Sequence, residues 1–142
     1  MSDPHFTRLV ALSDLHLAPA GEQCVFAAHE ALVALIDRLA AMPATEPATA
    51  LVLNGDVFDF LQIPGYDALS LPLAPQRMTV ILDSLDAEPP PRNVVQALRR
   101  FTAAGHTLCC LPGNHDAELN LVTVQQVLSQ LLGSSTDRKS VV

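Results

Sequence analysis

The chain has 142 residues, of which 49% are hydrophobic, so it is long enough for one domain with its own core. Its formal net charge of -7 argues against an electrostatic nucleic-acid binder, and no apolar run approaches the ~20 residues of a membrane span. Three cysteines are too few for a disulfide framework and the first residues do not resemble a signal peptide, so we expect a cytoplasmic protein.

The predicted elements begin with a strand, a helix and a second strand. Residues 8–13 and residues 50–54 are short apolar runs typical of buried strands. Between them, residues 22–42 have the periodicity of an amphipathic helix, which the prolines of residues 43–47 end. The apolar stripe of this helix is predicted to contain Val25, Leu32, Leu35, Ile36 and Leu39. Such a strand–helix–strand unit is parallel and almost always right-handed.

The remainder of the chain is predicted to add helices and a third strand. A turn-rich stretch, residues 63–75, comes first and is expected to be an excursion at the surface. Helices are predicted over residues 76–87, 93–104 and 122–132, and the third strand over residues 106–111. The alternation of strands and helices indicates the α/β class.

Three polar clusters each follow one of the predicted strands. They are Asp14-Leu15-His16, Gly55-Asp56-Val57-Phe58-Asp59 and Gly113-Asn114-His115-Asp116. Ligands of open α/β sheets bind outside the carboxyl ends of the strands, so we expect the clusters to meet there. Carboxylates, imidazoles and amide oxygens are the groups that divalent cations accept as ligands. One cluster alone could be an ordinary polar turn, but three in phase predict a metal site.

The residue types suggest how cations could be shared. Asp14 and His16 lie two residues apart, so one loop can turn both side chains onto the same ion. The two carboxylate oxygens of Asp56 allow it to bridge two ions, and Asn114 offers a neutral oxygen. His115 can either ligate a metal or donate a proton.

The three clusters, extended to Ser13, Asn54 and Pro112, resemble the motifs of the calcineurin-like metallophosphoesterases over about residues 8–132. The resemblance implies a phosphate-ester substrate and two divalent metal ions, with Mn as first choice and Fe, Zn, Co or Ni as alternatives. A water or hydroxide between the metals would attack phosphorus in line.

The same resemblance implies a role for each residue of the clusters. Asp14 and His16 would hold the first metal, Asp56 would bridge the two, and Asn114 would hold the second. His115 would protonate the departing oxygen. The groups implied to support these side chains are Asp59, which would orient His115, and Asp116, Gly55 and Gly113 behind the ligands.

By this resemblance the chain is the N-terminal parallel βαβ half of an α/β/β/α sandwich. Family members supply further histidines from the second half of the fold, whereas this chain has none after His115. The second metal would then have only two ligands, so we expect an incomplete fragment with little or no activity of its own. His5, His29 and His106 precede the third cluster and are interpreted as surface or structural residues.

The end of the chain is interpreted separately. Reverse translation of residues 137–142 as GAT CGG AAG AGC GTC GTG matches the start of a common short-read sequencing adapter. We therefore expect residues 1–136 to be the N-terminal part of a metallophosphoesterase domain and residues 137–142 to be a non-native tail.

Two further questions remain open at the level of sequence. The helix–proline–helix passage before the third strand is most similar to the bacterial branch that includes UDP-2,3-diacylglucosamine hydrolase-like proteins. The substrate could be a monoester, a diester or a pyrophosphate. The sequence does not indicate an oligomeric state. The alternative function is a non-catalytic scaffold or binding module with the same fold, although such a module has no physical need for several costly polar groups at one crevice.

Overall fold

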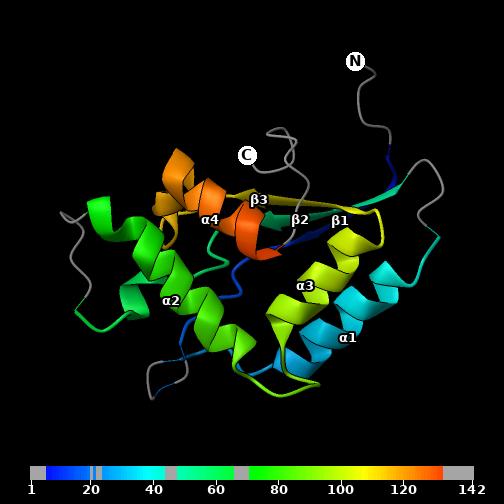
Figure 1. The fold of residues 1–142 in the computed structure, drawn as a ribbon. Helices are drawn as coiled ribbons and strands as arrows, with labels where there is room; N and C mark the ends of the chain where they lie inside the picture. Colours follow the sequence, from blue (N-terminus) through cyan, green and yellow to red (C-terminus); the bar gives the residue numbers. More distant parts are fainter. Residues whose placement is uncertain (1–5, 20, 22–23, 44–47, 66–70, 133–142) are drawn as a thin grey trace.

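The computed structural model of the chain describes residues 6–19, 21, 24–43, 48–65 and 71–132 (Figure 1). Its sheet has three strands in the order β1-β2-β3, which are β1 (Phe6–Leu12), β2 (Ala48–Asn54) and β3 (Thr107–Leu111). The α-helices of these residues are α1 (His29–Ala40), α2 (Ala74–Asp86), α3 (Val94–Ala103) and α4 (Val122–Leu132). The predicted α/β class is confirmed. The predicted non-native tail, residues 137–142, lies outside the described residues.

The register of the sheet brings all three strands to an end at one edge. Both strand pairs are parallel, with Leu12 of β1 beside Leu53 of β2, and Asn54 of β2 beside Leu111 of β3. The chain therefore leaves each strand at nearly the same level. The three polar clusters that follow the strands start from this common edge, as the rule for open α/β sheets requires.

The hydrophobic core lies on one face of the sheet. Figure 1 shows α1 and α3 side by side along this face, where Leu51, Leu53 and Leu108 are buried. Successive side chains of a strand point to opposite faces. On the other face Val52 is half-buried and Leu9 is 65% exposed. The described helices thus cover one face of the sheet more completely than the other.

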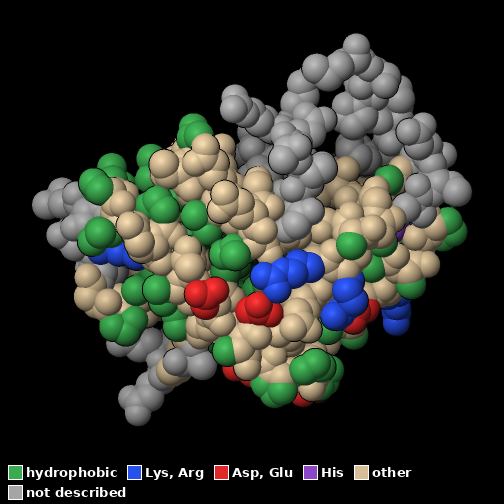
Figure 2. Space-filling model, viewed as in Figure 1, with side chains coloured by type: hydrophobic (Ala, Val, Ile, Leu, Met, Phe, Trp, Pro, Cys, Tyr) green, Lys and Arg blue, Asp and Glu red, His purple; other side chains and the backbone are tan. Residues whose placement is uncertain are grey.

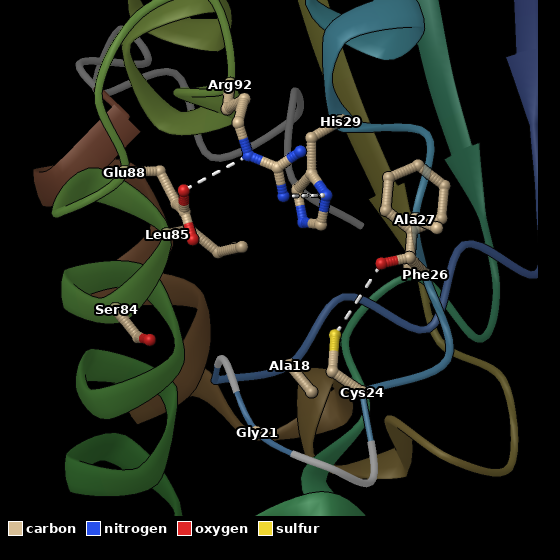
Figure 3. Close-up of a pocket in the computed structure, with 10 residues that line it drawn as sticks. All are labelled: Ala18, Gly21, Cys24, Phe26, Ala27, His29, Ser84, Leu85, Glu88 and Arg92. Atoms are coloured by element: carbon tan, nitrogen blue, oxygen red, sulfur yellow. Dashed lines mark hydrogen bonds and ion pairs between the residues drawn. The ribbon is translucent and has the colours of Figure 1, made fainter.

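The first helix is shorter than predicted. It begins at His29 instead of residue 22, and Val25, which was predicted in its apolar stripe, is 69% exposed. The preceding residues run across the end of α2, where Cys24, Phe26 and Ala27 help to line a cavity of about 290 Å³ (Figure 3). The Phe26 ring meets the His29 ring edge-on at 4.9 Å between centroids. The residues before His29 thus contribute to a cavity that Leu85 and Glu88 also line, and this tertiary environment competes with the helical periodicity there.

Two of the histidines outside the clusters are structural. His29 is 6% exposed, and burial followed by the nearby Arg92 lowers its pKa. His106 is 5% exposed and accepts a hydrogen bond at Nδ1 from the Thr49 backbone N–H at 3.2 Å. The His106 ring also stacks on Phe101 at 5.0 Å. His5, the third histidine of this group, lies outside the described residues.

The stretch before α2 only partly follows the prediction of a surface excursion. Residues 64–65 and the short 3-10 helix η2 (Leu71–Leu73) are exposed, but Ile63 packs into the core. Helix α2 also starts at Ala74, two residues earlier than predicted. Pro75 is tolerated in the first turn because the N–H that proline lacks has no partner there.

The later helices agree more closely with the sequence. The structure confirms α4 over the predicted residues 122–132, and α3 lies within the predicted residues 93–104. The Asn93 side chain caps α3 by accepting a hydrogen bond from the Gln96 N–H at 2.8 Å. Such N-caps satisfy a backbone donor that the helix itself leaves unpaired.

The surface of the helical layer carries charges of both signs. Figure 2 shows basic and acidic side chains next to one another on this face. Arg100 pairs with Asp37 at 2.9 Å, and Arg99 pairs with Asp86 at 3.0 Å. Within the described part of the chain, no helix has both the length and the apolar character needed to cross a membrane.

Candidate metal centre

The backbone turns sharply at three of the predicted ligands. Asp14, His16 and Asp56 have φ angles of 54°, 50° and 53°, a left-handed region that residues other than glycine rarely adopt. The two loops are joined by hydrogen bonds from the Asp14 N–H to the Gly55 carbonyl at 3.1 Å and from the His16 N–H to the Asp56 carbonyl at 2.9 Å. The loops after β1 and β2 therefore hold each other in this strained conformation.

Two glycines let the second and third clusters approach closely. Gly55 has a φ of 78°, and its N–H donates to the Leu111 carbonyl at 2.9 Å. A Cβ on Gly113 would lie 2.6 Å from the Asp56 backbone nitrogen, which is closer than real Cβ atoms come. Close packing of the two loops therefore excludes a side chain at Gly113, and the positive φ of Gly55 favours glycine there.

Asp116 joins the same two loops by accepting hydrogen bonds from their backbones. It is fully buried, and each of its carboxylate oxygens accepts two backbone hydrogen bonds. Oδ1 accepts from Asp56 at 3.1 Å and from Gly113 at 2.6 Å, while Oδ2 accepts from Val57 at 2.9 Å and Phe58 at 3.2 Å. Asp116 therefore acts on the loop backbones and does not face the ligand side chains.

The side chains predicted to share the first metal converge. One ligand atom from each of Asp14, His16 and Asp56 lies within 4.8 Å of the other two. Two carboxylates and an imidazole make a mixed oxygen and nitrogen donor set that suits borderline divalent cations. Asn114, predicted to hold a second metal, lies on the third loop with an exposed side chain, and its role stays a prediction.

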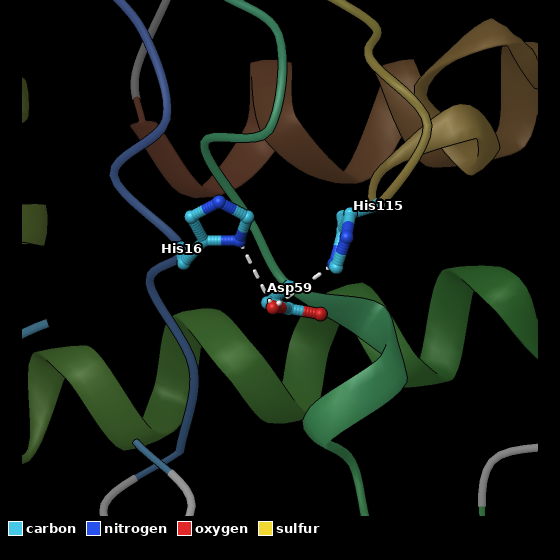
Figure 4. Close-up of side chains that lie close together, drawn as sticks. All are labelled: His16, Asp59 and His115. Carbon is cyan, nitrogen blue, oxygen red and sulfur yellow. Dashed lines mark hydrogen bonds and ion pairs between the residues drawn. The ribbon is translucent and has the colours of Figure 1, made fainter. Parts of the chain in front are cut away.

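Asp59 joins the first and third clusters through a single oxygen. Its Oδ2 is 3.0 Å from Nδ1 of His16 and 3.2 Å from Nδ1 of His115 (Figure 4). Burial alone would raise the pKa of Asp59, which is 2% exposed, but hydrogen bonds from His115, His16 and Gln62 outweigh burial and lower this pKa. The carboxylate is thus ionised at neutral pH and accepts hydrogen bonds from both rings.

His115 is fixed at its backbone and at its ring. Its N–H donates to Oδ1 of Asp56 at 2.9 Å, so the residue predicted as proton donor is tied to the residue predicted as bridge. The His115 ring stands edge-on to the His16 ring, with centroids 4.8 Å apart, and a third of its side chain is exposed. With Nδ1 engaged by Asp59, Nε2 is the ring nitrogen left for another partner.

Sequence reasoning missed two features of this arrangement. The contact between His16 and Asp59 joins residues 43 apart in the chain, and no local pattern indicates it. Gln62, which donates to Asp59 Oδ2 at 2.9 Å, was not singled out either. Its only sequence signal is a position three residues after Asp59, within reach across one turn of the 3-10 helix η1 (Phe60–Gln62).

Comparisons with known proteins agree with this geometry. Residues 7–139 match the family model described as calcineurin-like phosphoesterase. A search of curated proteins and a search of solved structures found no match. The match covers nearly the whole chain and includes all three clusters. The chain therefore belongs to the calcineurin-like phosphoesterase family.

Proposed function

We propose that the protein is a metal-dependent phosphoester hydrolase with a dinuclear metal centre at the carboxyl edge of the sheet. The observation that carries this proposal is the convergence of Asp14, His16 and Asp56, with ligand atoms within 4.8 Å of one another. Family membership supports phosphate esters as substrates. The sequence likeness of the helix–proline–helix passage before β3 is the basis for proposing the bacterial UDP-2,3-diacylglucosamine hydrolase-like branch, which makes a pyrophosphate a substrate to test beside simple esters.

The donor set fits the divalent ions that the family implies. Asp14 and His16 would hold the first ion, Asp56 would bridge the two, and Asn114 would complete what this chain offers to the second. When bound, such ions neutralise phosphoryl charge and lower the pKa of water. Cations of this kind usually take about six ligands, so we expect the second ion to bind more weakly than the first.

The other residues of the site would position the substrate and move a proton. His115 would protonate the departing oxygen from Nε2, because Nδ1 faces Asp59. The contact with the Asp59 carboxylate would fix the orientation of the ring, which a general acid needs in order to reach the departing oxygen. Phosphoryl transfer depends mainly on positioning and on charge neutralisation, so no protein nucleophile is required.

The test combines binding with turnover. Mn²⁺ binding to the full chain is measured by calorimetry, and hydrolysis of p-nitrophenyl phosphate, its bis ester and a pyrophosphate is measured with and without chelator. We expect Mn²⁺ binding that Asp56→Asn abolishes. Turnover by this chain should be low, because the second ion has only two ligands here, but chelator should remove it and His115→Ala should lower it further. Asp37→Asn, at an exposed ion pair in α1, is the control and should behave like wild type.

Three results would contradict the proposal. Wild-type protein that binds no Mn²⁺ would refute the metal centre itself. Turnover that chelator leaves unchanged, or Mn²⁺ binding that Asp56→Asn leaves unchanged, would favour the scaffold or binding module.

A further inference from the structure

The two oxygens of Asp59 have different partners. Oδ1 accepts the Leu61 backbone N–H at 3.1 Å, which caps η1. Oδ2 receives the donors from three side chains: Nδ1 of His16, Nδ1 of His115 and Nε2 of Gln62, at 3.0, 3.2 and 2.9 Å. The shortest of these contacts is the one from Gln62.

The Gln62 amide is oriented for Asp59 alone. Its Oε1 is buried and has no hydrogen-bond donor among the described residues. Turning the amide over would place Oε1 against Oδ2 of Asp59, so that two acceptors would face each other. Leaving a buried acceptor unpaired costs free energy, so the contact through Nε2 must outweigh that cost. The unpaired Oε1 destabilises the fold, so we ask what the hydrogen bond from Nε2 to Asp59 contributes to the site.

The other partners of Asp59 are the rings of His16 and His115. An ionised carboxylate accepts hydrogen bonds and donates none, so the rings of His16 and His115 must each carry a proton on Nδ1. Each ring then presents Nε2 as its free nitrogen. Because Nδ1 of both rings is engaged by Asp59, Nε2 of His16 would be the nitrogen left for the group formed with Asp14 and Asp56, and Nε2 of His115 would be left for a substrate.

We propose that Gln62 is a positioning residue that holds Oδ2 of Asp59 where both imidazoles meet, and so selects the tautomer of His16 and of His115. This inference rests on the proposed function for its consequence, because the tautomer matters for metal binding and proton donation. The placement of the three donors around one oxygen does not depend on that function. The direct partner of the His16 ring is Asp59, whose loss would typically weaken metal affinity ~10–100-fold, so displacement of Asp59 should cost about the lower end of that range.

The test replaces the amide with an apolar side chain of similar length. In Gln62→Met, Asp59 keeps its bond from Leu61 but loses the donor that holds Oδ2. Metal-free protein with ¹⁵N-labelled histidine is studied at pH 8 by ring ¹H–¹⁵N correlation, which distinguishes the two tautomers. We expect Nδ1–H rings in wild type and a shift towards Nε2–H in the variant, larger for His115 because its contact with Asp59 is longer.

Metal affinity is the second readout. Mn²⁺ should bind Gln62→Met about tenfold more weakly than wild type. The matched control is Gln125→Met in α4. The Gln125 side chain is also half-buried, and its amide donates to the Leu119 carbonyl at 2.9 Å. The control should leave the His16 and His115 signals unchanged. The melting temperature of the metal-free Gln62 variant should stay close to that of wild type, because the variant also removes an unpaired acceptor.

The outcomes separate this inference from the proposed function. Nδ1–H rings retained in Gln62→Met, together with Mn²⁺ affinity within twofold of wild type, would overturn the role of Gln62. Should that variant fail to fold, Gln62→Leu is judged by the same two measurements. Wild-type protein that binds no Mn²⁺ would remove the proposed function, while the tautomers would still decide the inference about Gln62.

Discussion

Asp116→Asn should remove much of the stability of the fold. The carboxylate of Asp116 accepts four backbone N–H groups, two at each oxygen, from Asp56, Gly113, Val57 and Phe58. In asparagine one of these oxygens becomes an NH₂ group, which donates and cannot accept. Two backbone donors then lose their acceptor and face another donor. At about 1–3 kcal/mol for each buried unsatisfied group, the free energy of unfolding should fall by about 2–6 kcal/mol.

Urea unfolding followed by circular dichroism measures this loss directly. A domain has only about 5–15 kcal/mol of stability, so the midpoint should move clearly or the variant should be unfolded at the start. Asp37→Asn is the control, because its pair with Arg100 is exposed and worth about 0–1 kcal/mol. If the free energy of unfolding of Asp116→Asn lies within about 1 kcal/mol of the wild-type value, the four hydrogen bonds to the carboxylate do not stabilise the loops as their geometry indicates.

Two further predictions concern a glycine and an ion pair. Gly113→Ala should abolish Mn²⁺ binding in calorimetry, because its Cβ would lie 2.6 Å from the Asp56 nitrogen, while Gly21→Ala, with open space around it, should bind normally. Burial would raise the pKa of Asp86, but hydrogen bonds led by that from Asn93 lower it. Because this pKa is lower in the folded state, the contribution of Asp86 is present above the ordinary value of 3.8 and is lost as pH falls through the folded pKa. The acid limb of the stability profile should therefore be shallower in Asp86→Asn, and an unchanged limb would contradict the assignment.

Periodicity and strand-end clusters predicted the parts of the molecule that depend on local pattern. The bounds of α4 follow its strong helical period, and the parallel sheet follows from the strand–helix–strand order. The predicted start of α1 was wrong, because Cys24, Phe26 and Ala27 line a cavity together with residues at the end of α2 instead of continuing the helix. Helical propensity is a weak prior wherever a tertiary contact competes with it.

The candidate site also has features that the sequence predicts and features that it does not. The convergence of Asp14, His16 and Asp56 could be predicted, because parallel strands end at one edge of a sheet. The contact of Asp59 with His115 was expected from the family resemblance, but the sharing of the same oxygen with His16 could not be predicted, since it depends on how loops 43 residues apart approach each other. Side-chain hydrogen bonds between distant loops are set by the packed backbone, and residue types alone do not specify them.

The strain at the candidate ligands suggests that the site is formed before any ion arrives. A left-handed conformation costs about 1–2 kcal/mol for a residue other than glycine, so Asp14, His16 and Asp56 together store about 3–6 kcal/mol. That cost is sustained by contacts that need no metal, namely the bonds of Asp14 and His16 to the second loop and the four bonds to Asp116. The cation would then have to offset only the repulsion between the Asp14 and Asp56 carboxylates, since the backbone is already in place. Because strain of this kind persists only where its surroundings over-determine it, the loops behind the ligands matter as much for binding as the ligands themselves.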